Sequence, residues 1–271
     1  MRDILEAVAA GDLDPAVAEA RLSGYATTGA GRFDAARETR RGVPEAILAE
    51  GKTPEEAATL ATAAVRSTGR AVLTRAADAH VDAVVDALDE TATFDRDDRA
   101  RTLVARAPDY EPPTLEATVG LVTGGTSDAE AAGEAAVILE AMGATVTRVE
   151  DVGVAHLGRV LDHLDTLRDA DVLVVAAGRE GALPTVVAGL VDTPVIGLPV
   201  STGYGYGGDG EAALAGMLQS CTIISAVNID AGFVAGAQAG LVARAVSDAR
   251  AANEDGGDES DRSDLSDASG R

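Results

Sequence analysis

The second half of the chain alternates apolar, β-branched runs of strand length with longer stretches of helical character. The runs that indicate strands are 117–122, 145–149, 172–176, 195–198 and 223–229. The stretches that indicate helices are 128–142, 156–168, 181–190, 210–219 and 232–250. Strands that alternate with helices form a parallel sheet covered on both faces. The pattern predicts a three-layer α/β/α domain with a flavodoxin-like parallel sheet, whose ligands bind outside the carboxyl ends of the strands.

The first part of the chain is less regular and predicts a small α+β domain. The ranges expected to form helices are 2–10, 14–22, 44–48 and 78–88, and those expected to form strands are 70–74 and 102–106. Thr53 and Pro54 start a further helix, with Thr53 as its N-cap. Pro108, Pro112 and Pro113 form a stiff joint. The domains are therefore predicted at residues 1–112 and 113–250.

The chain ends in an acidic segment, residues 251–271, that contains a single leucine. Such a segment cannot bury enough apolar surface to offset the entropy lost on ordering. We therefore expect this tail to be disordered and to lie outside the fold.

Composition limits the function classes. The 271 residues carry 22 basic and 45 acidic side chains, a formal net charge of -23. This acidity disfavours binding to nucleic acid, because the chain repels phosphate instead of releasing counterions from it. Lys52 is the one lysine, and acidity with so little lysine is typical of a protein from a salt-loving organism.

Cellular location is also predicted from the sequence. One cysteine excludes an internal disulfide framework. The sequence has neither a run of about 20 apolar residues nor a signal-peptide pattern at its start. We expect a cytoplasmic protein that does not enter a membrane.

Two loops at predicted carboxyl strand ends could carry chemistry. The first, 123–128, has glycines and hydroxyls that suit a phosphate, or it is an ordinary turn with a Ser or Asp N-cap. The second, 176–184, places Arg179 and Glu180 between Gly178 and Gly181. Glu180 is either a functional carboxylate or a capping carboxylate paired with Arg179.

A third loop, residues 201–210, interleaves five glycines with Tyr204 and Tyr206. Ordering such a loop is costly in entropy. It is either disordered or a close-fitting ligand clamp, and its place after a strand favours the clamp.

Cys221 has two interpretations. A lone cysteine is usually an inert, buried apolar side chain, and the functional alternative is a thiolate nucleophile. A β–α–β count places Cys221 at the amino end of the last strand, away from the loops above. For Cys221 to lie beside those loops, the chain needs an unusual helix–strand turn or a neighbouring subunit.

Three further side chains have open roles. Lys52 either binds a carboxylate or phosphate or caps a helix beside Gly51, and Arg41 is a weaker candidate of the same kind. His156 lies in a strand-to-helix loop and is a candidate ligand contact, whereas the histidines as a group lack metal-binding spacing.

Several strings together resemble known families. The strings 124–128, 177–184 and 194–199 look like the PurE-type domain of aminoimidazole ribonucleotide carboxylases. The Ser-Ala-His-Arg string of that enzyme is altered here to Gly153-Val154-Ala155-His156. A closer resemblance, over nearly the whole ordered chain, is to the LarB family of nickel-pincer cofactor biosynthesis carboxylases. The strings that carry it are 42–45, 50–55, 125–128, 151–154, 178–184, 203–205, 217–221 and 227–230. Arg179 departs from the apolar residue, often Met, expected before the glutamate.

The LarB resemblance implies a reaction. The pyridinium ring of nicotinic acid adenine dinucleotide is carboxylated with carbon dioxide or bicarbonate as co-substrate, and the phosphoanhydride is hydrolysed. The products are pyridinium-3,5-biscarboxylic acid mononucleotide and AMP. The resemblance implies Cys221 as the nucleophile, and we hypothesise Glu180 as the base.

Binding roles and assembly follow from the same resemblance. Ser127 and Asp128 would hold phosphate or its Mg²⁺, with Asp128 as the metal ligand. The other residues expected to bind substrate or phosphate are Gly125, Thr126, Gly178, Gly203, Tyr204, Gly205, Lys52, Arg41 and His156. PurE-type domains form octamers, which implies a homo-oligomer here. The alternatives are an aminoimidazole ribonucleotide carboxylase or mutase, and a non-catalytic nucleotide-binding protein with an inert thiol.

Overall fold

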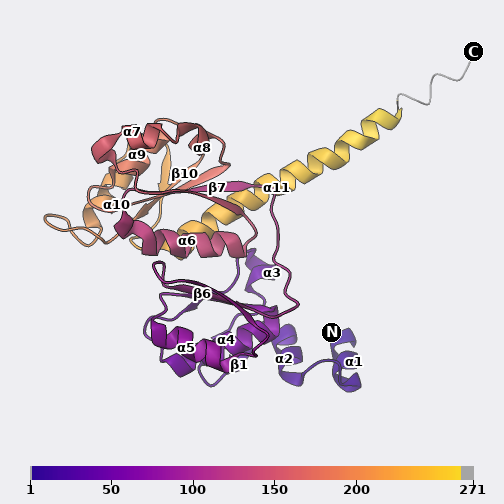
Figure 1. Ribbon diagram of the computed structural model, residues 1–271. Helices are drawn as coiled ribbons and strands as arrows, with labels where there is room; N and C mark the ends of the chain where they lie inside the picture. The colour runs from indigo at the N-terminus through magenta and orange to yellow at the C-terminus, as the bar shows by residue number, and fades with distance from the viewer. Residues whose placement is uncertain (1, 264–271) are drawn as a thin grey trace, which may run out of the picture.

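The computed structural model describes residues 2–263 and contains two stacked domains (Figure 1). The second domain is built on five parallel strands in the order β11-β10-β9-β7-β8. Their bounds are β7 (Thr118–Thr123), β8 (Thr145–Val149), β9 (Val172–Ala177), β10 (Val195–Pro199) and β11 (Ile224–Ala226). The order reverses between β7 and β9, as in flavodoxin-like sheets. The predicted three-layer domain with a flavodoxin-like parallel sheet is confirmed.

Helices cover both faces of this sheet. Successive residues of β9 point to opposite sides, so Val174 packs in the cluster of α6 and α11, and Val175 packs against the helices of the other face. The helices are α6 (Ala129–Ala141) and α11 (Gly232–Ser263) on the first face, and α7 (Gly158–Leu161), α8 (Leu164–Arg168), α9 (Ala182–Ala188) and α10 (Glu211–Leu218) on the second. The 3₁₀ turns η1 (Thr126–Asp128) and η2 (Val154–His156) follow β7 and β8.

The first domain is a mixed sheet of order β3-β4-β6-β5. Its strands are β3 (Ile47–Leu48), β4 (Arg70–Thr74), β5 (Thr93–Asp97) and β6 (Thr102–Arg106), with a hairpin of β1 (Ala26–Thr28) and β2 (Gly31–Phe33) beside it. Its helices are α1 (Arg2–Ala10), α2 (Pro15–Ser23), α3 (Arg37–Arg41), α4 (Pro54–Thr68) and α5 (Asp78–Ala87). Thr53 and Glu56 form a capping box at the start of α4, as the Thr-Pro pair predicts.

Helix α6 lies between the two sheets (Figure 1). Alternate residues of β4 explain the layering: Leu73 faces α4, while Val72 joins Val137 and Ile138 of α6 in a separate cluster. The approach is close at Gly133, where a Cβ would lie 2.2 Å from the Ala100 Cβ. Because α6 is buried from Ala131 to Leu139, it serves as core for both domains.

Several local expectations differ from the structure. Residues 44–48 do not form a helix; Ile47 and Leu48 instead pair in parallel with Leu73 and Thr74, so tertiary pairing overrides the Pro-Glu start signal. The hairpin β1–β2 and helix α3 were not expected because each is short, and strand β5 was not expected because its residues, Thr-Phe-Asp-Arg-Asp, are mostly polar. None of the helices within residues 2–263 is long and apolar enough to span a membrane.

The acidic tail also differs in part from the expectation of disorder. α11 continues without a break to Ser263, extending away from the domains (Figure 1). No proline interrupts residues 251–263, and helix propagation from a packed segment needs no new nucleation. Residues 264–271 lie outside the described part of the chain.

Candidate functional site

The carboxyl ends of β7 and β9 meet at the point where strand order reverses. After β7, the chain turns through Gly124 and Gly125 into η1, and Asp128 lies buried at its end. The Gly125 N–H donates to Asp128 Oδ2 at 2.8 Å. Burial raises the pKa of Asp128, although the N–H groups of Gly125, Gly124 and Gly178 oppose this shift. The carboxylate bonds back to the loop instead of capping α6, so it organises the glycine turn.

Gly178 allows the loop after β10 to close on this turn. A Cβ at Gly178 would lie 2.3 Å from the Thr202 carbonyl oxygen, so no larger residue fits without movement. The Thr202 hydroxyl in turn donates to the Ser127 carbonyl at 3.5 Å. Three predicted site residues, Ser127, Asp128 and Gly178, therefore converge with Thr202 at one place.

Residues 201–210, the glycine–tyrosine loop, form a cavity of about 380 Å³ beside this turn. It is lined by Arg179, Glu180, Gly203, Tyr204, Gly205, Tyr206, Gly207, Gly208, Gly210 and Ala212. The Arg179 guanidinium lies 4.3 Å from the Tyr204 ring centroid, a cation–π contact. Within residues 2–263 the Glu180 carboxylate has neither an ion pair nor a hydrogen bond, so pairing with Arg179 does not occupy it. Glu180 is exposed and free to act on a ligand in this cavity.

Cys221 follows helix α10 and is not part of the lining of this cavity. It is exposed in the turn between α10 and β11, at the amino end of the edge strand. Its neighbour Ser220 accepts a hydrogen bond from Thr185 of α9 at 2.9 Å, and Glu180 precedes the start of that helix. Cys221 does not line the glycine–tyrosine cavity, but the helix before it packs on Glu180, because a Cβ at Gly216 of α10 would lie 2.3 Å from the Glu180 carbonyl oxygen.

Two exposed apolar side chains lie close to Cys221 in the sequence. Leu218 is 69% exposed and Ile223 is 96% exposed, on either side of Cys221 in the sequence. β11 pairs only with β10 and is an edge strand. A surface of this kind is typical of a contact with another molecule.

The remaining predicted residues are dispersed. Lys52 donates from Nζ to the Leu48 carbonyl at 2.6 Å, and Arg41 is exposed at the end of α3. His156 is exposed in η2, after a loop whose Val152 N–H bonds to the Thr123 carbonyl at 3.0 Å. His156 therefore lies on a loop tied to the end of β7, whereas Lys52 and Arg41 belong to the first domain.

Three arginines that the sequence did not single out reach from the first domain to this edge of the second. Arg99 donates to the Thr126 carbonyl at 2.9 Å, and Arg101 pairs with Glu130 at 2.9 Å. Arg75 donates to the Asp230 carbonyl at 2.8 Å. A cavity of about 190 Å³ between the domains includes Arg75, Ser127 and Asp230 in its lining. No sequence signal distinguishes these arginines from the other basic residues, because only the stacking of the domains brings them here.

Asp128 is the candidate metal ligand at the turn. Within the described part of the chain, no group of three His, Cys, Asp or Glu side chains is arranged to hold a metal ion. Mg²⁺ usually binds through one or two carboxylates together with waters and substrate phosphates. Oδ2 of Asp128 accepts the Gly125 N–H at 2.8 Å. A metal-binding role for Asp128 stays a prediction.

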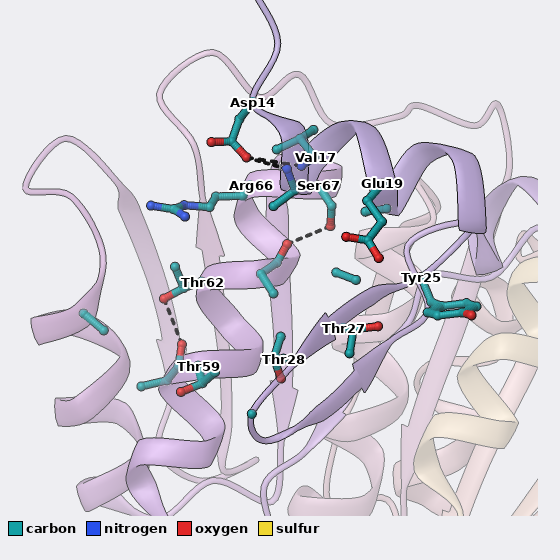
Figure 2. A pocket seen from close by; sticks show the side chains of 17 residues that line it. Asp14, Val17, Glu19, Tyr25, Thr27, Thr28, Thr59, Thr62, Arg66 and Ser67 are labelled. Atoms are coloured by element: carbon teal, nitrogen blue, oxygen red, sulfur yellow. Dashed lines mark hydrogen bonds between the residues drawn. The ribbon is translucent and has the colours of Figure 1, made fainter. Parts of the chain in front are cut away.

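A cavity of about 490 Å³ in the first domain lies apart from these residues. Helices α2 and α4 and the β1–β2 hairpin enclose it, and Arg66, Glu19 and Tyr25 lie around it (Figure 2). The Thr62 and Ser67 hydroxyls donate to carbonyls of their own helix. It contains no candidate residue from the sequence and lies away from the carboxyl ends of the parallel sheet, so it is not the candidate site.

Comparison with known proteins agrees with this arrangement of domains. Residues 25–107 match the LarB/PurE-like N-terminal domain, and residues 118–255 match the AIR carboxylase domain, where AIR is aminoimidazole ribonucleotide. An uncharacterized protein of Methanocaldococcus jannaschii is 37% identical over 254 residues, covering 90% of this chain and 97% of the relative. The chain therefore belongs to the AIR carboxylase family, has the two-domain architecture of LarB, and has a function of the carboxylase type.

Proposed function

We propose that the protein carboxylates the pyridinium ring of nicotinic acid adenine dinucleotide and hydrolyses its phosphoanhydride. The observation that carries this proposal is the free Glu180 carboxylate in a glycine-lined cavity. This cavity lies next to the turn that ends at Asp128, in a chain of LarB architecture. The products would be pyridinium-3,5-biscarboxylic acid mononucleotide and AMP. The reaction is the first step of a nickel-pincer cofactor synthesis.

The chemistry needs a nucleophile and a base. A pyridinium carbon is cationic and does not attack carbon dioxide. Addition of the Cys221 thiolate to the ring gives a neutral dihydropyridine, whose enamine carbon forms the new bond to carbon dioxide. The Glu180 carboxylate then takes the proton from that carbon, and the thiolate leaves as aromaticity returns. Attack of water on the phosphoanhydride separates AMP from the mononucleotide.

The proposal requires Cys221 to reach a ring held near Glu180. We place this meeting between two copies of the chain, because the thiol is exposed beside Leu218 and Ile223 on an edge strand. A neighbouring copy that covers this surface would bring its own glycine–tyrosine cavity toward the thiol. Sedimentation in high salt should show an oligomer, and a fully active monomer would contradict this arrangement.

The test is a product assay in about 1 M potassium chloride, a concentration at which surface repulsion is screened. The protein receives nicotinic acid adenine dinucleotide, bicarbonate and magnesium, and mass spectrometry looks for AMP and for a mononucleotide heavier by one carboxylate. Cys221→Ala should abolish the carboxylated product. Glu180→Gln should slow turnover by on the order of 10²-fold or more if Glu180 is the base. Normal turnover by the Cys221→Ala protein would exclude the covalent route.

A second candidate has its own support, because residues 118–255 match the AIR carboxylase domain. Aminoimidazole ribonucleotide and bicarbonate, offered in the same assay, test it directly. Turnover of the purine precursor without turnover of the dinucleotide would favour this candidate. If neither substrate reacts, a thiol titration with and without dinucleotide tests the non-catalytic binding role, since a site thiol is protected by its ligand.

A further inference from the structure

We propose that Arg75 is a positioning residue: it fixes the glycine–tyrosine loop of the second domain from the first domain, through Asp230. Arg75 follows β4 and has a left-handed backbone, with φ of 53°. Its carbonyl accepts a hydrogen bond from Arg101 at 3.1 Å. A left-handed conformation is unfavourable for a residue with a side chain, and it persists only where the surroundings hold it.

The Arg75 guanidinium is engaged on three sides. Nη2 donates to the Asp230 carbonyl at 2.8 Å, Nη1 lies 3.2 Å from Glu50, and Nε lies 3.5 Å from Glu134. Glu134 is only 4% exposed and belongs to α6, which is core to both domains. The guanidinium is therefore held by a buried carboxylate, and it brings one donor to Asp230.

Asp230 binds both sides of the turn that leaves β10. Its N–H donates to the Pro199 carbonyl at 2.9 Å, and its Oδ1 accepts from the Ser201 N–H at 2.9 Å. Asp230 is also left-handed, with φ of 53°. The hydrogen bond from Arg75 to its carbonyl stabilises this conformation, so Arg75 determines where the carboxylate meets Ser201.

The next residue in the loop connects this arrangement to the candidate site. The Thr202 carbonyl packs against Gly178, and its hydroxyl donates to Ser127. Gly203 and Tyr204 then enter the cavity that Glu180 lines. Loss of Arg75 would release Asp230, then Ser201, and then the wall of that cavity. In this way the first domain acts on the site without touching the substrate.

Hydrogen exchange tests the connection without any substrate. In Arg75→Ala, amide exchange in a peptide covering residues 200–205 should rise by roughly 10-fold or more, because the Ser201 amide loses a stable charged acceptor. Arg75→Lys keeps one donor and should restore part of the protection. Arg96→Ala is the matched control, since Arg96 pairs with Asp78 on the first domain and makes no contact with Asp230.

A second variant keeps the test decisive if Arg75→Ala does not fold. Asp230→Gly tolerates the left-handed backbone but removes the acceptor of the Ser201 N–H. It should raise exchange in the same peptide, and adding Arg75→Lys should cause little further change. Unchanged exchange in Arg75→Ala, or in Asp230→Gly, would overturn the proposal.

The role in turnover rests on the proposed function. Arg75→Ala should lower kcat/KM for the dinucleotide by roughly 10-fold or more, with a partial recovery in Arg75→Lys. Raised exchange with unchanged turnover would overturn the positioning role. A wild-type protein that does not convert the dinucleotide would refute the proposed function, while the exchange result would still decide whether Arg75 holds the loop.

Discussion

Replacing Gly178 by alanine tests whether the loops after β9 and β10 must touch. The added Cβ would lie 2.3 Å from the Thr202 carbonyl oxygen, whereas ordinary contact begins near 3.4 Å. The two backbones would have to separate by about 1 Å. Because the obstructing atom belongs to the main chain, no side-chain rotation can remove the clash.

The expected cost follows from this displacement. Overpacking of a close contact costs about 1–3 kcal/mol. For a chain of this size, each kcal/mol lowers Tm by roughly 2–4 °C. A shift of about 1 Å in residues that position a substrate can also lower kcat/KM by up to about 10²-fold. Gly178→Ala should therefore lose both stability and turnover.

The assay is thermal unfolding, followed by dinucleotide turnover below the transition. Gly203→Ala is the matched control for stability, because its Cβ would meet nothing closer than the Arg179 amide nitrogen at 3.5 Å. It should unfold within about 1–2 °C of the wild type. An unchanged Tm in Gly178→Ala, or an equal loss in Gly203→Ala, would refute the steric argument.

Four further predictions concern the scaffold. Ile138→Ala should cost about 2–5 kcal/mol in urea unfolding, because the side chain is fully buried between the domains; a loss near zero would contradict that burial. Thr53→Ala should cost about 1 kcal/mol by the same measurement through loss of the capping box with Glu56, and Thr53→Ser should restore most of it. Burial opposes ionisation of Asp171, but Arg250 and the Thr118 N–H lower the pKa of this carboxyl below 3.8. The Asp171 carboxylate therefore stabilises the folded state at neutral pH, and this stabilisation is lost as pH falls through the lowered pKa. Asp171→Asn should therefore have a lower Tm than the wild type at pH 7, with the gap narrowing in acid; a constant gap would reject the linkage. At a net charge of -23, raising potassium chloride from about 0.1 M to about 1 M should raise Tm, because the screening length falls from ~10 Å to ~3 Å; a lower Tm would count against charge repulsion.

The parallel domain was predictable because its signals are local. Its central strands β9 and β10 are continuous apolar runs, and the 2-1-3-4-5 order follows once the family resemblance is recognised. Thr53 and Pro54 gave the start of α4 for the same reason: the N-cap and first-turn signals are adjacent in the sequence. Residues 47–48 show the opposite case, since two residues become a strand only by pairing with β4.

The candidate site was predictable only in part. The loops at Asp128 and Gly178 were found because carboxyl strand ends of a parallel sheet meet at one edge. Arg75 could not be found, because its partners Asp230 and Glu134 are distant in sequence and meet it only when the domains stack. The thiol of Cys221 was expected to lie away from the other loops, and the turn before β11 places it outside the cavity lined by Glu180.

The burial of α6 on both sides makes the two domains a single cooperative unit. A fragment containing only the AIR carboxylase match would expose Val137 and Ile138, which now pack against Val72 and Val104 of the first domain. Conversely, the first domain alone would lose the helix that covers one face of its sheet. Heating should therefore produce one unfolding transition instead of two. A substitution in the first domain that faces α6 would also need a compensating change in α6, which belongs to the second domain.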